Sequence, residues 1–358
     1  MNRACKLLLL GVLLLMPIAM PIHAQQTCSA PYYVEQSFPT AGPEQTRWKL
    51  CWQVQNGPNL VITGAWFRPN PQAAWIKLIY DARVSQLFVP YHAGSPRYLD
   101  VNFGFGSVPL TSGDCPAPTG TVLGASAELC KQVRDRGLAW KHDAIFRRGE
   151  ELVLWSVLAA ANYNYIVEWT FRDDGAVIGR VGATGQIAGT DSHMHGPIWR
   201  LDLDLDGACC DTVMRYAHKE SAGPSASDAM SDITKEERLP WNAPEFTSLH
   251  IRDAVRKNGN GHPSEWHLMP TRDGTPIHQE AFTKNALWVT RYHWNEMAGN
   301  DLPTYVNGET TSNSDVVLWY YGGLHHHVRD EDESMTHLMW VGFMLKPFNV
   351  FTHTPLYP

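Results

Sequence analysis

The sequence predicts an all-β protein whose strands are mainly antiparallel, and three observations support this. After residue 45, short apolar or alternating stretches are separated by Gly, Pro and Asn, as strands are separated by turns. Asp174-Gly175 lies between two such stretches, and Asp-Gly accepts the positive φ that a hairpin turn needs. In the segment 199–206, leucine and aspartate alternate, which places carboxylates on one face of a strand and leucines on the other.

The individual strands follow from the same patterns. We expect them at Trp48–Val54, Leu60–Phe67, Trp75–Tyr80, Ser85–Val89, Ile166–Phe171, Ala176–Val181, Trp199–Asp206, Leu287–His293, Val316–Tyr321 and Trp340–Lys346. One helix is expected over Ala125–Arg136, because the apolar residues Leu129 and Val133 are four positions apart. Ser221–Glu237 is rich in Ser, Ala, Asp and Lys, so we expect an exposed connection there.

The first residues predict a secretory signal peptide over residues 1–24. Arg3 and Lys6 form a positive start, Leu7–Met20 is an apolar run, and Ala24 ends a small-residue cleavage site. The apolar run is too short for a membrane anchor. We therefore expect an exported protein, periplasmic or secreted, whose mature chain of residues 25–358 forms one large β domain or two smaller ones.

The charge of the chain limits its partners. It has 29 basic and 36 acidic residues, a formal charge of −7, and loss of Arg3 and Lys6 with the signal would make this −9. Nucleic acid is an unsuitable partner for such a chain, because phosphates need basic residues. An acidic surface favours solubility and attracts cations weakly.

The cysteines indicate disulfide bonds. Removal of Cys5 with the signal leaves six of the seven, and an even number in an exported chain favours pairing. Six cysteines allow 15 pairings. Cys28 and Cys51 suggest a link near the N-terminus, and Cys115 and Cys130 enclose a short loop. Cys209 and Cys210 are adjacent, and the sequence does not identify their partners.

Histidines provide a candidate metal site. His193 and His195 share a face of a strand, so both imidazoles can reach one metal ion, although most such pairs are simply solvated. In the run His325–His327, alternation places His326 on one face and its two neighbours on the other. Three imidazoles suit copper and zinc equally well.

Aspartates provide two further candidates. Asp202 and Asp204, together with Asp315, offer oxygen ligands suited to calcium, although a solvent-facing strand edge is the simpler interpretation of the spacing. Asp100 lies between Tyr98 and the glycine-rich Phe103–Gly106. An acid beside aromatic rings can have a raised pKa and act as a base, but an ordinary turn aspartate fits equally.

A series of motifs in order resembles the catalytic domain of the copper- and topaquinone-dependent amine oxidases. The resemblance extends from about residue 48 to residue 353 and rests on Tyr98–Asp100 with Phe103–Gly106, Asn162–Trp169, Val181–Gly185, His193–His195, Arg200–Gly207, Leu287–His293 and Gly342–Asn349. It implies a large β-sandwich in a single catalytic domain over residues 25–358, usually a homodimer, without the small N-terminal domains of larger members.

The resemblance also implies roles for particular residues. Tyr163 would be the precursor of topaquinone, which forms a Schiff base with the amine. Asp100 would be the proton acceptor, Tyr91 would hydrogen-bond the quinone, and Tyr98 would line the substrate entrance. Copper ligands would be His193, His195 and His326, the last because it precedes Arg329 by three residues.

The implied cofactors are copper, topaquinone and calcium. The calcium site would comprise the side chains of Asp202, Asp204 and Asp315 and the carbonyl groups of Leu203 and Val316. A disulfide between Cys115 and Cys130 is implied as well. The implied reaction converts a primary amine and dioxygen to an aldehyde, ammonia and hydrogen peroxide, with neither a nucleic-acid nor a membrane partner.

Some residues depart from the family pattern. Asn164 replaces the usual acid after the tyrosine, Ala159 replaces a threonine, and Glu333–Thr336 replaces a proline-rich run. Two other hypotheses therefore remain. One is a copper- or zinc-binding β-sandwich protein without quinone or turnover. The other is a protein whose main role is assembly or partner binding, with a β-sandwich that a metal ion stabilises.

Overall fold

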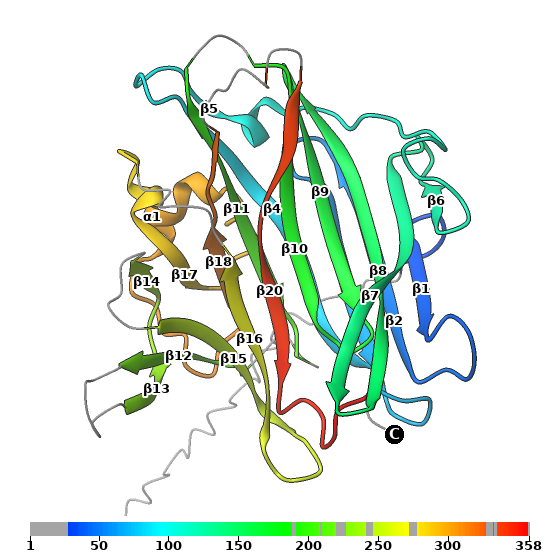
Figure 1. Ribbon diagram of the computed structural model, residues 1–358. Helices are drawn as coiled ribbons and strands as arrows, with labels where there is room; N and C mark the ends of the chain where they lie inside the picture. Colours follow the sequence, from blue (N-terminus) through cyan, green and yellow to red (C-terminus); the bar gives the residue numbers. More distant parts are fainter. Residues whose placement is uncertain are drawn as a thin grey trace, which may run out of the picture.

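The computed structural model describes residues 28–356, except 188–190, 206, 208–209, 220–226, 241–245, 272–277, 327–331 and 333–334. Two large antiparallel sheets pack face to face in this structure (Figure 1). The all-β sandwich expected from the sequence is therefore confirmed. The proposed signal peptide, residues 1–24, lies outside the described residues.

The first sheet carries most of the N-terminal strands. Its strands, in spatial order, are β1 (Tyr33–Phe38), β2 (Thr46–Gln55), β3 (Asn59–Arg68), β4 (Ile76–Pro90), β11 (His193–Leu203), β18 (Val316–Tyr321), β17 (Asn285–Arg291) and β14 (Glu237–Pro240). Two short strands pair beside this path: β5 (Arg97–Leu99) next to β4, and β19 (Leu324–His326) next to β11.

The second sheet covers the first. Its strands, in spatial order, are β13 (Ser227–Ile233), β12 (Thr212–Lys219), β15 (Phe246–Lys257), β16 (Pro263–Thr271), β20 (Thr336–Phe348), β10 (Val177–Gly185), β9 (Tyr163–Arg172), β8 (Ile145–Ala160), β7 (Leu129–His142) and β6 (Gly120–Leu123). Helical turns occur at Asp100–Phe103, Ala281–Lys284 and Gly299–Asp301, followed by the one-turn helix α1 (Leu302–Tyr305). No described helix is long and apolar enough to cross a membrane.

A single aromatic-rich core joins the sheets. Trp199 of β11 stacks on Tyr320 of β18, with ring centroids 5.4 Å apart and planes 8° apart. It also meets Phe343 of β20 edge-on at 5.4 Å, across the two sheets. Such offset and edge-on contacts add about 0.5–1.5 kcal/mol beyond burial of the ring area. Among the described residues, seven tryptophans are fully buried: Trp48, Trp52, Trp169, Trp199, Trp266, Trp288 and Trp319.

Strand β11 is the element on which the site depends. Every residue from His193 to Leu203 is buried, since β4 and β18 flank the strand in its own sheet and the second sheet covers it. Asp202 and Asp204 are therefore buried, at 2% and 5% exposure. The solvent-facing strand edge was the wrong interpretation of the alternating segment, because both faces of this strand are covered.

Most expected strands are confirmed, with shifts of a few residues at their ends. The turn between β9 and β10 contains Gly175 with φ +88°, as the Asp-Gly signal predicted. The two strands expected at Trp75–Tyr80 and Ser85–Val89 are one continuous strand, β4. The sequence between them contains neither Gly nor Pro, so nothing breaks the strand there.

The helix expected over Ala125–Arg136 is wrong, because β7 begins at Leu129 and pairs with β8 along its length. Residues four positions apart share a face in a strand as well as in a helix, so the spacing of Leu129 and Val133 did not distinguish the two. Ser221–Glu237 is also not merely a connection. It contains β13, whose polar sequence suits the edge of a sheet.

Disulfide bonds form between Cys28 and Cys51 and between Cys115 and Cys130, as the sequence and the resemblance respectively indicated. Cys210 is disulfide-bonded as well, while Cys209 lies outside the described residues.

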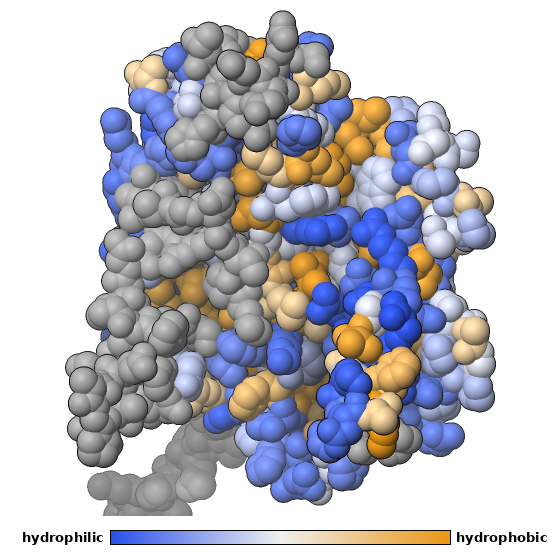
Figure 2. All heavy atoms as spheres, viewed as in Figure 1, coloured by the Kyte–Doolittle hydropathy of each residue, from blue (hydrophilic) through white to orange (hydrophobic). Residues whose placement is uncertain are grey.

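Apolar side chains reach the surface where β7 turns into β8. Leu138, Ile145 and Phe146 are more than half exposed. Orange spheres lie among blue ones over this lower end of the hairpin (Figure 2).

Replacing Trp199 with Ala should lower the free energy of unfolding by about 3–5 kcal/mol, because a large cavity would open between the sheets. Urea unfolding followed by circular dichroism measures this loss. Trp294→Ala is the matched control: its side chain is 81% exposed, so its effect should stay within about 0.5 kcal/mol. Equal effects of the two substitutions would contradict the assignment of Trp199 to the core.

Candidate active site

Three histidines converge at one end of β11. His193 and His195 project from β11, and His326 lies opposite His193 in the antiparallel pairing with β19. All three are buried, and their ligand atoms lie within 4.8 Å of one another. Within the described parts of the chain, no other group of three His, Cys, Asp or Glu residues converges in this way.

Each histidine has one ring nitrogen held by a partner away from the centre. His193 Nδ1 donates to the Asp191 carbonyl oxygen at 3.1 Å. His326 Nε2 donates to the Asp332 carboxylate at 3.3 Å. His195 Nδ1 lies 2.9 Å from the Tyr165 hydroxyl. Such outer partners fix the tautomer of a metal-binding imidazole.

The remaining nitrogens point to a common centre. His193 Nε2 and His326 Nδ1 lie 3.1 and 3.0 Å from the Tyr163 hydroxyl. His195 Nε2 is buried and has no hydrogen-bond partner among the described residues. Burial lowers the pKa of His193 to about 4 and lowers the pKa of His195 well below its usual range. Both rings are therefore neutral at pH 7, and the three nitrogens fit a copper or zinc ion.

Tyr163 is the first residue of β9 and follows the tight turn that leaves β8. Ala161 takes a left-handed φ of +53° in that turn. Gly185 of β10 lies against this turn, and a Cβ added at Gly185 would come within 2.3 Å of the Asn162 carbonyl oxygen. A glycine is needed there to let the two backbones approach. Burial raises the pKa of Tyr163 above its usual range, so the ring is a neutral phenol.

Asp100 lies next to this centre. It begins the helical turn after β5, is 7% exposed, and accepts a hydrogen bond of 3.0 Å from the Tyr165 hydroxyl. Burial raises its pKa to about 6, although the Tyr165 hydrogen bond opposes the rise. A carboxyl group with this pKa is mostly ionised at pH 7 and still basic enough to accept a proton.

Aromatic rings lead from the surface to the histidines. Tyr91, just after β4, stacks on His193 with ring centroids 4.6 Å apart. Tyr98 lies 6.2 Å from Tyr91 and is 42% exposed. Phe103 is 6.2 Å from Tyr98 and more exposed still. Tyr98 thus lies at the rim and Tyr91 at the centre.

A second group of acids lies at the other end of β11. Burial raises the pKa values of Asp202 and Asp315 to about 7, and repulsion from neighbouring aspartates adds to this. Arg200 donates to Asp202 at 3.2 Å, and Lys77 forms an ion pair with Asp204. The carboxylates do not converge as the histidines do.

Sequence reasoning did not single out Asp211, which joins this acidic group with a pKa raised to about 9 by burial and by neighbouring acids.

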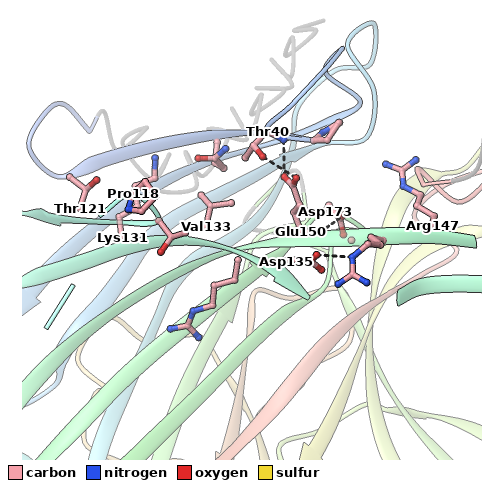
Figure 3. Close-up of a pocket in the computed structure, with 15 residues that line it drawn as sticks. Thr40, Pro118, Thr121, Lys131, Val133, Asp135, Arg147, Glu150 and Asp173 are labelled. Carbon is pink, nitrogen blue, oxygen red and sulfur yellow. Dashed lines mark hydrogen bonds and ion pairs between the residues drawn. The ribbon is translucent and has the colours of Figure 1, made fainter. Parts of the chain in front are cut away.

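A separate hollow of about 650 Å³ lies between the N-terminal strands and the β6–β8 region, and Figure 3 shows the side chains that line it. Two of its charged groups have partners across it: Glu150 accepts a hydrogen bond from Thr40, and Arg148 forms an ion pair with Asp135. None of the candidate site residues lines this hollow.

Comparison with known proteins agrees with the geometry. The profile of the copper amine oxidase enzyme domain matches residues 45–192 and 188–357. The chain belongs to the copper amine oxidase family. An Arabidopsis thaliana copper-containing amine oxidase gamma 2 is 26% identical over 94% of this chain and 61% of its own length. A primary amine oxidase of Arthrobacter sp. (strain P1) is 26% identical over 78% of this chain and 54% of its own length.

Solved structures show the same fold. The Hansenula polymorpha copper-containing benzylamine oxidase superposes with a TM-score of 0.72 at 19% identity, covering 87% of this chain and 60% of that chain. The Pichia pastoris lysyl oxidase gives a TM-score of 0.71 at 19% identity, with coverage of 87% and 53%. This copper amine oxidase family member thus spans 61% of the length of the Arabidopsis relative and 54% of the length of the Arthrobacter relative.

The sequence analysis missed the residues that support the ligands, namely Asp191, Asp332 and Tyr165. A signal existed for Tyr165, since it stands two residues after Tyr163 on a strand and shares its face. Arg329, cited for the choice of His326, and His327 lie outside the described residues.

Replacing His195 with Ala should weaken copper binding more than about 100-fold, because even loss of a partner of a ligand costs 10- to 100-fold. Competition with a copper chelator measures the affinity. His142→Ala is the control, as this side chain is 87% exposed. Unchanged copper affinity in the His195 variant would contradict the proposed ligand set.

Proposed function

We propose that this chain is a copper-containing primary-amine oxidase, with topaquinone formed from Tyr163 and copper held by His193, His195 and His326. The observation that carries the proposal is the position of the Tyr163 hydroxyl. It lies 3.0–3.1 Å from two ring nitrogens that face the metal position. A metal ion bound by these nitrogens would therefore lie beside the phenol.

The geometry distinguishes Tyr163 from its neighbour. The Tyr165 hydroxyl faces Nδ1 of His195, the nitrogen that points away from the metal position. The Tyr163 hydroxyl faces the metal side of His193 and His326. Tyr163 is therefore the better candidate for oxidation, in agreement with the family pattern.

Two of the departures from that pattern, Asn164 of β9 and Ala159 of β8, lie on the face of the sheet opposite to Tyr163. Asn164 is exposed and pairs across the sheet with Ala159, while Tyr163 and Tyr165 point inward. Neither of these two residues touches the histidines, so neither argues against the oxidase.

Copper and the quinone would supply the electron sink and the reduction of dioxygen. Asp100 would take the proton from the amine-bearing carbon, and its buried position keeps it basic. Tyr91 would hold the cofactor through its position against His193, and Tyr98 would admit the amine at the rim. The products would be an aldehyde, ammonia and hydrogen peroxide.

Calcium binding is a further part of the proposal, at Asp202, Asp204 and Asp315 with the carbonyl groups of Leu203 and Val316. What supports it is a group of buried carboxylates whose pKa values rise through burial first and through mutual repulsion in addition. A bound cation would relieve that repulsion. Elemental analysis of the purified protein that finds no calcium, even after dialysis against it, would contradict this part.

We also propose export with cleavage near Ala24 and assembly as a homodimer. The charge and hydropathy of residues 1–24 support export. The exposed apolar tip of the β7–β8 hairpin supports a contact with a second copy. N-terminal sequencing and light scattering test these parts. An intact Met1 in the exported fraction, or the mass of one chain, would contradict them.

Copper-loaded protein kept in air should become coloured and bind one phenylhydrazine per chain, because a quinone carbonyl condenses with the hydrazine. Mass spectrometry should place the modification on Tyr163. Tyr163→Phe should abolish it, whereas Tyr32→Phe, at an exposed ring, should not. Colourless copper-loaded protein with unmodified Tyr163 would support the metal-binding alternative.

Peroxide release with a primary amine should increase as the pH rises through about 6, because Asp100 accepts a proton only when it is ionised. A panel of amines at several pH values, read through peroxide, gives the profile. Asp100→Asn should lower kcat by about 10²- to 10⁴-fold. An Asn variant with native turnover would exclude Asp100 as the base.

A further inference from the structure

Tyr165 touches both halves of the site. Its hydroxyl donates to Asp100 Oδ2 at 3.0 Å and lies 2.9 Å from Nδ1 of His195. It is 1% exposed. The proposed base and a proposed metal ligand therefore have a buried hydrogen-bond partner in common.

The direction of these hydrogen bonds follows from proton counting. A hydroxyl has one proton to donate, and an ionised carboxylate can only accept. When Asp100 is ionised, Tyr165 donates to it and its oxygen accepts from the Nδ1–H of His195. That tautomer leaves Nε2 of His195 with a lone pair, and Nε2 is the buried nitrogen without a partner among the described residues.

The backbone holds Tyr165 firmly in place. In β9, Tyr165 pairs with Leu158 of β8 on one side and with Ala183 of β10 on the other. His195 belongs to the opposite sheet, and Asp100 to the turn after β5. The hydroxyl thus joins three segments, and burial of the ring at 1% exposure restricts its movement.

We propose that Tyr165 is a positioning residue that couples the two halves of the site, fixing the metal-binding tautomer of His195 and orienting the Asp100 carboxylate. The half that concerns Asp100 rests on the proposed oxidase function. The half that concerns His195 requires only that the histidines bind a metal.

The first test measures Cu(II) affinity by competition with a chelator, which requires neither quinone nor turnover. Tyr165→Phe keeps the ring and removes the hydroxyl, and it should weaken Cu(II) binding 10- to 100-fold. Tyr305→Phe is the matched control. It removes a hydroxyl that accepts from the backbone N–H of Ala298, away from the histidines, and should leave the affinity unchanged. Thermal unfolding of both variants shows whether they remain folded.

A double-mutant cycle tests the coupling itself. Asp100→Asn should weaken Cu(II) binding when Tyr165 is present and have no effect in the Tyr165→Phe background, because the hydroxyl transmits the influence of the carboxylate. A charge acting through space would give effects that add. Additive effects, or native affinity in Tyr165→Phe, would overturn the proposal.

The second test uses turnover of benzylamine as the probe. Tyr165→Phe should lower kcat by on the order of 10- to 100-fold through misplacement of the base, with KM unchanged, because Tyr165 is fully buried behind Asp100. The isotope effect with α-deuterated benzylamine should rise as proton removal becomes slower. If the protein without substitutions does not turn over benzylamine, the oxidase proposal fails, but the measured effect of Tyr165→Phe on Cu(II) affinity still stands. Native kcat in the variant would overturn the base-orienting role.

Discussion

Complete coverage of β11 is the constraint on which the rest of the structure depends. The strand carries apolar residues and a tryptophan at its centre, histidines at one end and aspartates at the other, all of them buried. Buried polar groups are tolerated only when they are hydrogen-bonded or bound to an ion. The neighbours of β11 therefore had to supply partners at both ends, and these partners define the candidate sites.

The two ends meet this requirement differently. At the histidine end, each outer nitrogen has a partner and the inner nitrogens converge, which leaves room for one ion. At the aspartate end, Arg200 and Lys77 already neutralise part of the charge, and the carboxylates remain spread out. The first arrangement is suited to redox chemistry with a tightly held metal, whereas the second is suited to structural support.

Much of this could be read from spacing along single strands. Alternation correctly placed His193 and His195 on one face, and it could also have found Tyr165. The choice of His326 as the third ligand came from the family resemblance. Alternation could not predict contacts between the sheets, because the pattern within one strand does not indicate which strand packs against it. The Asp100–Tyr165 contact joins residues 65 positions apart, and the burial of Asp202 depends on the covering sheet. The role of Tyr91 came from family resemblance alone, and the resemblance decided between a base and an ordinary turn aspartate at Asp100.

The long separation between site residues has a consequence for folding. Tyr163 and His326 are 163 residues apart, so their contact exists only after strands from distant parts of the chain have paired. Before that stage, His193 and His195 lack their third imidazole, and two ligands hold a metal less tightly than three. Metal bound by all three histidines would thus report that the sandwich has closed.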